Sequence, residues 1–196
     1  MDLSWPLENS VNDAVRSDSY LDTTFLLTLP TIDHVIKGVK KFGKNSCLAK
    51  IDISRAFKHI PIDPKDLQYL GLFWEAFYIE LNLVFGFKLG SAFFQRFSDS
   101  LRFILTSEGH YCVNYIDDYV LFGNEAACSA AFERLQKLLA ELGLDISVHK
   151  NVPSATKVTC LGVLVNTEDF TVSVPPEKLE EIKNLCRSWA KNPKCI

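Results

Sequence analysis

Two adjacent carboxylates, Asp117 and Asp118, lie in the middle of an apolar run, NYIDDYVLFG, at residues 114–123. The aromatic and β-branched residues on both sides are typical of a buried strand. A pair of aspartates in such a run costs free energy unless it lies at a turn, is paired with a cation or binds a metal ion. The choice among these three explanations decides what chemistry the chain can perform.

A third carboxylate, Asp52, lies in a second apolar segment, CLAKIDIS, at residues 47–54. Strand alternation places Asp52 on the face opposite the apolar residues Ala49, Ile51 and Ile53. If this strand pairs with a hairpin that bends at the two aspartates, the three carboxylates meet at one edge of the sheet. Such a group binds hard cations such as Mg²⁺, and two ions about 3.5–4 Å apart stabilise both oxygens of an in-line phosphoryl displacement.

A plainer explanation exists for the aspartate pair. Asp-Asp is common in tight turns, because aspartate tolerates turn geometry and bonds to its own backbone. A turn alone therefore explains the dipeptide, and the surrounding segments must decide between turn and metal site.

Those segments alternate between helical and extended patterns. Apolar periodicity predicts helices at residues 31–43, 91–106 and 132–143, and a last helix after Pro175-Pro176. Strand patterns favour hairpins over 70–83 and 111–122 and short strands at 145–148, 158–165 and 170–174. This order predicts an α+β fold of the split βαβ kind, with an antiparallel sheet and helices on one face.

The composition indicates one domain and limits its class. Apolar residues make up 47% of the 196 residues, with 14 Phe, so a sizeable core is expected. The net charge of −3 excludes nucleic-acid binding by overall charge alone. The six cysteines form no CxxC pair, which favours reduced thiols in an intracellular protein, cytoplasmic or nuclear. No signal-peptide pattern or apolar run of membrane length is visible, so no membrane partner is expected.

Five segments together resemble the reverse transcriptases, in that family's order and over nearly the whole chain. YIDD resembles the YxDD signature of the family, and CLGVLV resembles its FLG-type primer grip. DLSWPLENSVND and SAFFQRFSD are further similar to the retrotransposon branch, most closely to DIRS-type elements. The five segments are AKIDISRAFKHIPI (49–62), LVFGFKLGSAFFQR (83–96), YIDD (115–118), LGLDISVHKN (142–151) and CLGVLV (160–165).

The resemblance implies an RNA-directed DNA polymerase that transfers nucleotides from dNTPs to a primer 3′-hydroxyl on an RNA or DNA template. It implies two Mg²⁺ ions, with Mn²⁺ as an alternative. Asp52, Asp117 and Asp118 would be catalytic and would bind the metal, together with the backbone carbonyl of Ile53. Lys150 would protonate the pyrophosphate leaving group.

Four further residues would contact the substrates. Phe57 would be a steric gate beneath the deoxyribose, and Phe85 and Gly86 would lie in the loop against the incoming nucleotide. Gln95 would lie near the template. The plainer alternatives are a core position for Phe57 and a solvated surface position for Gln95 and for Lys150.

By the same resemblance, the chain would be one partial domain. Residues 1–46 and 58–82 would belong to incomplete fingers, residues 47–57 and 83–174 to the palm, and residues 175–196 to the start of a truncated thumb. The basic fingers strand that grips the triphosphate would be missing, so weak or no polymerase activity is expected of the chain alone.

The loop at residues 83–90 departs from the family pattern, since Val84 stands where proline is usual and Lys88-Leu89-Gly90 replaces a more polar step. A catalytically inactive relic that keeps its carboxylates is therefore an alternative. A palm-like nucleotide cyclase is disfavoured, because Asn114-Tyr115-Ile116 stands where that class has Gly-Gly. An RNA-binding sheet module is disfavoured because no aromatic- and Gly-rich strand is visible.

Overall fold

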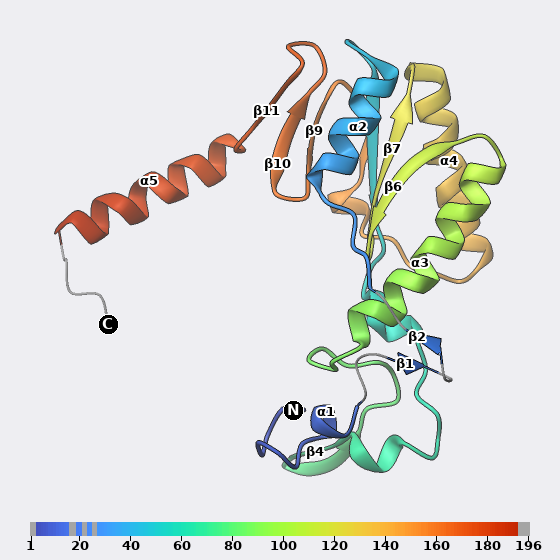
Figure 1. Cartoon of the computed structure of the whole chain (residues 1–196), viewed down its shortest axis with the longest axis vertical. Coiled ribbons are helices and arrows are strands. Elements are labelled where there is room, and N and C mark those ends of the chain that lie inside the picture. Colours follow the sequence, from blue (N-terminus) through green and yellow to red (C-terminus); the bar gives the residue numbers. More distant parts are fainter. Residues whose placement is uncertain (1–2, 16–18, 21–22, 25–26, 192–196) are drawn as a thin grey trace.

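The computed structural model describes residues 3–15, 19–20, 23–24 and 27–191 (Figure 1). A four-stranded sheet lies at its centre, and all its neighbouring strands run antiparallel in the order β6-β7-β3-β8. These strands are β3 (Cys47–Asp52), β6 (Tyr111–Tyr115), β7 (Asp118–Gly123) and β8 (Val152–Ala155).

Two long helices, α3 (Gly90–Ser107) and α4 (Glu125–Glu141), cover one face of this sheet. The core on this face includes Phe94, Leu101 and Leu105 from α3, Leu135 and Leu139 from α4, and Ala49, Ile51, Tyr119 and Leu121 from the sheet. The chain order β3-α3-β6-β7-α4-β8 is a split βαβ arrangement. The expected α+β fold, with an antiparallel sheet and helices packed on it, is confirmed.

The opposite face is also covered, which adds to the expected arrangement. Helix α2 (Ile32–Phe42) follows Thr31 and ends at Gly43, as predicted, and its Val35 and Val39 pack on this face. Gly38 allows the close approach, since a Cβ there would lie 2.7 Å from the Phe122 ring. A three-stranded sheet of β9 (Lys157–Cys160), β10 (Val163–Asn166) and β11 (Thr171–Ser173) completes the cover.

Residues 145–148 do not form the predicted strand. They pass the end of β3 and make a single bridge, Ile53 with Ile146, before the 3-10 turn η3 (Val148–Lys150). The pairing strand is β8 instead, which joins the edge of the sheet beside β3. The segment bonds to the end of β3 only around this bridge, because the chain turns into η3 at Val148.

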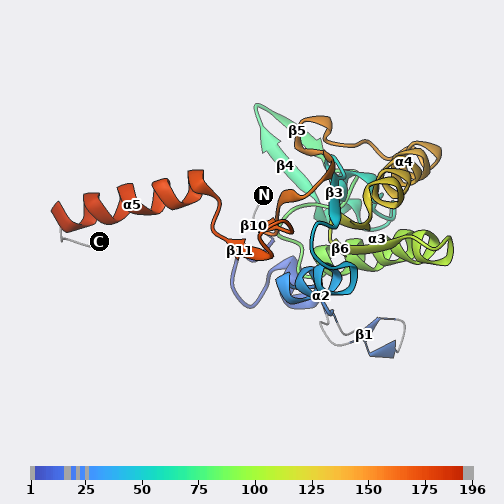
Figure 2. The ribbon, with the colours of Figure 1, turned by 90° about the horizontal axis from the view of Figure 1, so that it is seen from above.

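Of the remaining elements, η1 (Ala56–His59) joins the core through Ala56, whereas α5 (Pro176–Lys191) and the hairpin of β4 (Gly71–Trp74) and β5 (Ala76–Ile79) project from this layered body (Figures 1 and 2). Helix α5 extends away from the sheets and has no buried residue. None of the helices in the described part of the chain is long and apolar enough to cross a membrane. Cys47, Cys112, Cys128 and Cys160 are buried free thiols. The other short elements are α1 (Val11–Ala14), β1 (Ser19–Tyr20), β2 (Thr23–Thr24) and η2 (Leu67–Tyr69).

Candidate active site

The pairing of β3 with β7 brings the carboxylates from two distant segments together. In this antiparallel register, Asp52 lies directly opposite Asp118. The Ile53 amide donates a hydrogen bond of 3.0 Å to the Asp117 carbonyl, so the pairing continues to the turn. Because directly opposite residues of an antiparallel pair project to the same face, Asp52 and Asp118 share a face, and the strand pairing that the sequence left conditional is present.

A segment after α4 brings Lys150 to the same place. The Ser54 amide bonds to the Asp145 carbonyl and the Ser147 amide to the Asp52 carbonyl, each at 2.8 Å. The turn η3 follows at once, and Lys150 Nζ lies 3.1 and 3.2 Å from the two carboxylate oxygens of Asp52. The ammonium group therefore pairs with a carboxylate that is only 4% exposed.

A second lysine, which the sequence reasoning did not single out, pairs with a second carboxylate of the site. Lys50 Nζ lies 3.1 Å from Asp118 Oδ1, and both side chains are mostly buried. The alternation of β3 could have identified Lys50, because residues two apart in a strand share a face and Lys50 is two residues before Asp52.

Burial and charge perturb the acidic groups. Burial is the main cause that raises the pKa of Asp118, the charges of Asp117 and Asp52 raise it further, and Lys50 opposes the rise. Burial likewise raises the pKa of Asp117, as does the charge of Asp52. The hydrogen bond and the charge of Asp52 raise the pKa of Lys150, which keeps its ammonium form. The site thus holds more negative charge than its surroundings favour.

This donor set fits Mg²⁺ by its chemistry. Carboxylate and carbonyl oxygens are the ligands of hard cations, and mutual repulsion of the aspartates would be relieved by a bound cation. The ammonium groups of Lys50 and Lys150 already act as counter-charges to Asp118 and Asp52. Within the described ranges, no three acidic, histidine or cysteine side chains are grouped closely enough to hold a metal ion. Water and substrate phosphates would therefore have to complete the coordination.

Phe57 lies near these carboxylates in sequence but is packed against aromatic neighbours. The ring is partly buried, with its centroid 5.0 Å from that of Phe85 and 6.0 Å from that of Phe94. Phe85 itself is 75% exposed. Phe57 thus has one ring neighbour in the core and one at the surface, a position compatible with both the gate and the core explanations.

The loop that carries Phe85 and Gly86 is tied to the N-terminal segment. Gly86 has a φ of +87°, in the left-handed region that favours glycine, and a Cβ there would meet no atom within 4 Å. Asn12 Nδ2 donates to the Gly86 carbonyl at 2.8 Å, and the Lys88 amide donates to Asn12 Oδ1 at 2.8 Å. Asn12, which was not predicted to matter, therefore fixes the path of this loop.

Gln95 is buried rather than solvated, with 2% of its surface exposed. Its Oε1 accepts a hydrogen bond of 2.7 Å from the Ile116 amide at the hairpin turn. The surface alternative for Gln95 is therefore wrong. In this structure the side chain contacts the aspartate hairpin, and its contact with a template stays a prediction.

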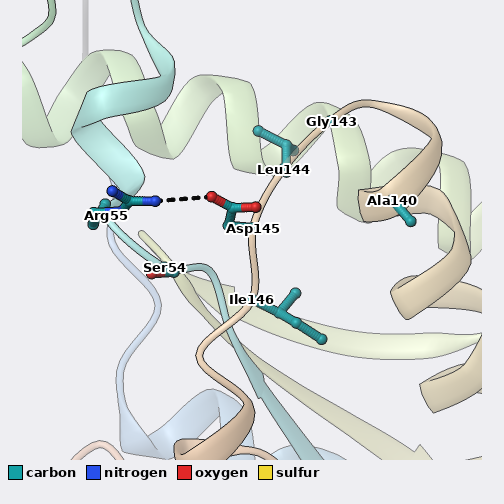
Figure 3. A pocket seen from close by; sticks show the side chains of 7 residues that line it. All are labelled: Ser54, Arg55, Ala140, Gly143, Leu144, Asp145 and Ile146. Atoms are coloured by element: carbon teal, nitrogen blue, oxygen red, sulfur yellow. Dashed lines mark hydrogen bonds and ion pairs between the residues drawn. The ribbon is translucent and has the colours of Figure 1, made fainter.

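A pocket lies beside the end of β3, between the start of η1 and the loop after α4 (Figure 3). Arg55 and Asp145 face each other across it, with Arg55 Nη2 3.0 Å from Asp145 Oδ2. Both side chains are more than half exposed, so this ion pair contributes little to stability.

The comparisons with known proteins identify a family and a fold. A family model described as reverse transcriptase (RNA-dependent DNA polymerase) matches residues 7–165. A structure of the foamy viral protease-reverse transcriptase dRH in complex with double-stranded DNA has a TM-score of 0.69 and 20% identity, covering 89% of this chain and 28% of that one. The complex of that enzyme with an RNA/DNA hybrid has a TM-score of 0.67 and 21% identity, covering 89% of this chain and 22% of that one.

The native Prototype Foamy Virus protease-reverse transcriptase has a TM-score of 0.58 and 18% identity, covering 94% of this chain and 25% of that one. No curated protein sequence matches the chain. The chain spans between 22% and 28% of these three structures, and at such identities the likeness shows the fold alone. Because the family model matches most of its residues, the chain belongs to the reverse transcriptase family.

Proposed function

We propose that this chain is the catalytic part of an RNA-directed DNA polymerase of a retroelement, which transfers nucleotides from dNTPs to a primer 3′-hydroxyl on an RNA or DNA template. The observation that carries the proposal is the register of β3 and β7, which places Asp52 opposite Asp118 beside the turn of Asp117. A turn alone requires no third carboxylate and no lysine partners at the same edge.

In this proposal Asp52, Asp117, Asp118 and the Ile53 carbonyl would hold two divalent cations, Mg²⁺ or Mn²⁺. When bound, such ions supply Lewis-acid stabilisation of the attacking and leaving oxygens. The primer 3′-hydroxyl loses its proton to solvent and its oxygen forms a bond to the α-phosphorus of the dNTP, while the bond from that phosphorus to the α,β-bridging oxygen breaks and pyrophosphate leaves. The protein's part is to hold the carboxylates in a fixed arrangement on the sheet.

Lys150 would provide the proton for the leaving pyrophosphate. The hydrogen bond to Asp52 and the charge of that carboxylate raise the pKa of Lys150, so Nζ carries a proton that it can donate. Lys150 Nζ lies at the same edge as the carboxylates, 3.1 Å from Asp52 Oδ2, so its ammonium group would donate a proton to the phosphate oxygen that leaves there.

The remaining residue and subdomain assignments of this proposal follow from the resemblance to the family. Phe57 would lie beneath the sugar of the incoming nucleotide, with Phe85 and Gly86 in the neighbouring loop. Residues 47–57 and 83–174 would be the palm, with fingers at 1–46 and 58–82 and a thumb that begins at 175–196. The origin in a DIRS-type retrotransposon belongs to the proposal as well.

A second candidate is a folded relic with no enzymatic role. It is favoured by one observation: Lys150 pairs with Asp52 and Lys50 pairs with Asp118, so two of the three carboxylates already have counter-charges. If these ion pairs persist when metal and nucleotide are present, the site cannot act as a polymerase.

A primer-extension assay separates the two candidates. In a polymerase that carries this chain with basic segments on both sides, Asp117→Asn should lower the rate of extension of oligo(dT) on poly(rA) by about a thousandfold or more, because metal ions contribute several kcal/mol to the transition state. The purified chain alone should extend the primer weakly or not at all.

Asp145→Asn is the matched control, since it makes the same change at a carboxylate that is 63% exposed and pairs with Arg55. Extension by Asp117→Asn at close to the unchanged rate would show that the hairpin is only a turn.

Sugar selection gives an independent test. Phe57→Val should raise incorporation of ribonucleotides relative to deoxyribonucleotides, because removal of the ring opens the space for a 2′-hydroxyl. The melting temperature should change little, since the ring is only partly buried. Phe103→Val, at a ring that is 71% exposed on α3, is the control. A folded Phe57→Val variant that keeps the original preference would rule out the gate.

A further inference from the structure

A layer of buried polar side chains lies between α3 and the aspartate hairpin. Burial of such groups costs free energy unless each finds a partner. Tyr119 and Ser98 bond to each other through their hydroxyl groups at 2.6 Å, and Asn114 Nδ2 donates to Ser98 Oγ at 3.0 Å. The four buried members are Gln95 with 2% exposed and Ser98, Asn114 and Tyr119 with none exposed.

Asp99 is the charged member of this layer and lies at its edge. Its Oδ1 accepts hydrogen bonds of 3.0 Å from Gln95 Nε2 and from Asn114 Nδ2. Arg102 Nε lies 3.5 Å from the same oxygen. The Asp99 side chain is 42% exposed, so its charge stays in contact with water while one oxygen serves the buried amides.

The carboxylate favours one orientation of the two amides, and for Gln95 the Asn114 carbonyl adds to this, since it accepts from Nε2 at 3.4 Å. An ionised carboxylate can only accept hydrogen bonds, so each amide must present its NH₂ group to Asp99. The Gln95 amide then has its oxygen on the other side, where Oε1 accepts the Ile116 N–H at 2.7 Å. The reversed amide would place its NH₂ group against that N–H, two donors face to face.

The bond to Ile116 holds a strained residue in place. Ile116 has a φ of +53°, a left-handed conformation that β-branched residues rarely adopt. The next two residues are Asp117 and Asp118. A change in the Ile116 backbone would therefore rotate the turn that carries both carboxylates.

We propose that Asp99 is a positioning residue for the carboxylates of the hairpin, which acts by fixing the Gln95 amide so that it bonds to the Ile116 N–H. This proposal rests on the proposed function only in that the carboxylates of the hairpin are taken as catalytic. The chain of contacts Asp99–Gln95–Ile116 can be tested without metal, nucleotide or activity, so an inactive chain leaves the test intact.

Amide hydrogen exchange in the ¹⁵N-labelled chain measures this contact directly. Asp99→Ala should speed exchange of the Ile116 amide by roughly three- to tenfold, the range that corresponds to the net free energy of one hydrogen bond. Exchange of the Leu121 amide, in the middle of β7, should not change. Asp99→Asn should restore slow exchange at Ile116, because its side-chain oxygen can accept from both amides.

A double variant tests whether Asp99 acts through Gln95. Gln95→Met, of similar length but without hydrogen-bonding groups, should speed Ile116 exchange as Asp99→Ala does. Adding Asp99→Ala to Gln95→Met should produce no further increase. Asp145→Ala serves as the control for loss of an exposed carboxylate and should leave Ile116 unchanged.

Three results would overturn the proposal. Ile116 exchange could be the same in Asp99→Ala as in the unchanged chain. Leu121 exchange could rise with it, which would indicate general loss of stability. The effect of Asp99→Ala could also persist in full with Gln95→Met, which would show that it does not pass through Gln95.

Discussion

Two antiparallel hairpins of this chain have similar local geometry and opposite surroundings. Hairpin β6–β7 turns at Ile116 with a φ of +53°, and hairpin β4–β5 turns at Glu75 with a φ of +58°. All residues of β7 after Asp118 are buried, whereas every residue of β4 and β5 is exposed. Figure 2 shows β4 and β5 projecting from the body that contains β3, α3 and α4.

The difference shows what positions the charged residues. At the β6–β7 hairpin, helix α3 packs against the strands, Gln95 accepts a hydrogen bond from the Ile116 amide at the turn, and β3 pairs with β7. At the β4–β5 turn, Phe73 is 75% and Trp74 is 71% exposed, and among the described strands β4 and β5 form a two-stranded sheet of their own. A left-handed turn residue is therefore common to both hairpins, and packing accounts for the fixed position of the carboxylates.

The largest change in the free energy of unfolding is expected from a substitution in the packed β6–β7 hairpin. Leu121→Ala should lower the free energy of unfolding by about 2–5 kcal/mol, because the side chain is fully buried between the sheet and the α3–α4 layer. Chemical denaturation followed by circular dichroism measures the change. A loss below about 0.5 kcal/mol would contradict the contrast between the hairpins.

A smaller effect of opposite sign is expected at the tip of the same hairpin. The pKa of Asp118 is raised in the folded chain, chiefly by burial, so the folded state holds its proton more tightly than the unfolded state. The stability that this proton provides is lost as pH rises from the ordinary aspartate pKa through the raised one. Asp118→Asn should therefore be more stable than the unchanged chain at neutral pH.

The pH dependence supplies the check on this prediction. The advantage of Asp118→Asn should grow as pH rises through that window and become constant above it, as measured by thermal unfolding at a series of pH values. An advantage that is greatest at acidic pH, or a less stable variant at neutral pH, would show that the Lys50 pair outweighs burial.

The smallest effect is expected at the exposed hairpin. Phe73→Ala should change the free energy of unfolding by about 0.5 kcal/mol or less, because the ring loses little contact with the protein. The same denaturation experiment measures it. A loss comparable to that of Leu121→Ala would mean that β4–β5 packs against the body in solution.

The sequence predicted the parts of the fold that depend on local pattern. Helix α2 begins after Thr31 and ends at Gly43 because a hydroxyl cap and a left-handed glycine are local signals. Strand β8 was not predicted, since its segment contains Pro153 and has no alternation. It forms because β3 offers an open edge, and a proline is tolerated in an edge strand.

The sequence identified the carboxylates of the candidate site, but not their ion pairs with lysines or the residues that hold their hairpin in place. Asp52 and the aspartate pair stood out because charge in an apolar run is costly. The pairing of Lys50 with Asp118 and the burial of Gln95 depend on strands distant in sequence. A polar residue on a helix carries no local sign that its partner is the backbone of a hairpin some twenty residues later.

We propose that the three carboxylates at the β3–β7 edge bind divalent cations, which would replace the lysine partners of Asp52 and Asp118. Paramagnetic broadening by Mn²⁺ of the amide signals of the ¹⁵N-labelled chain, with a dNTP present, tests it most directly. Signals of Ile53, Asp117 and Asp118 should broaden at lower Mn²⁺ concentration than those of the exposed β4–β5 hairpin, and Asp52→Asn should abolish this preference. Uniform broadening along the chain, or an unchanged preference in Asp52→Asn, would contradict the claim.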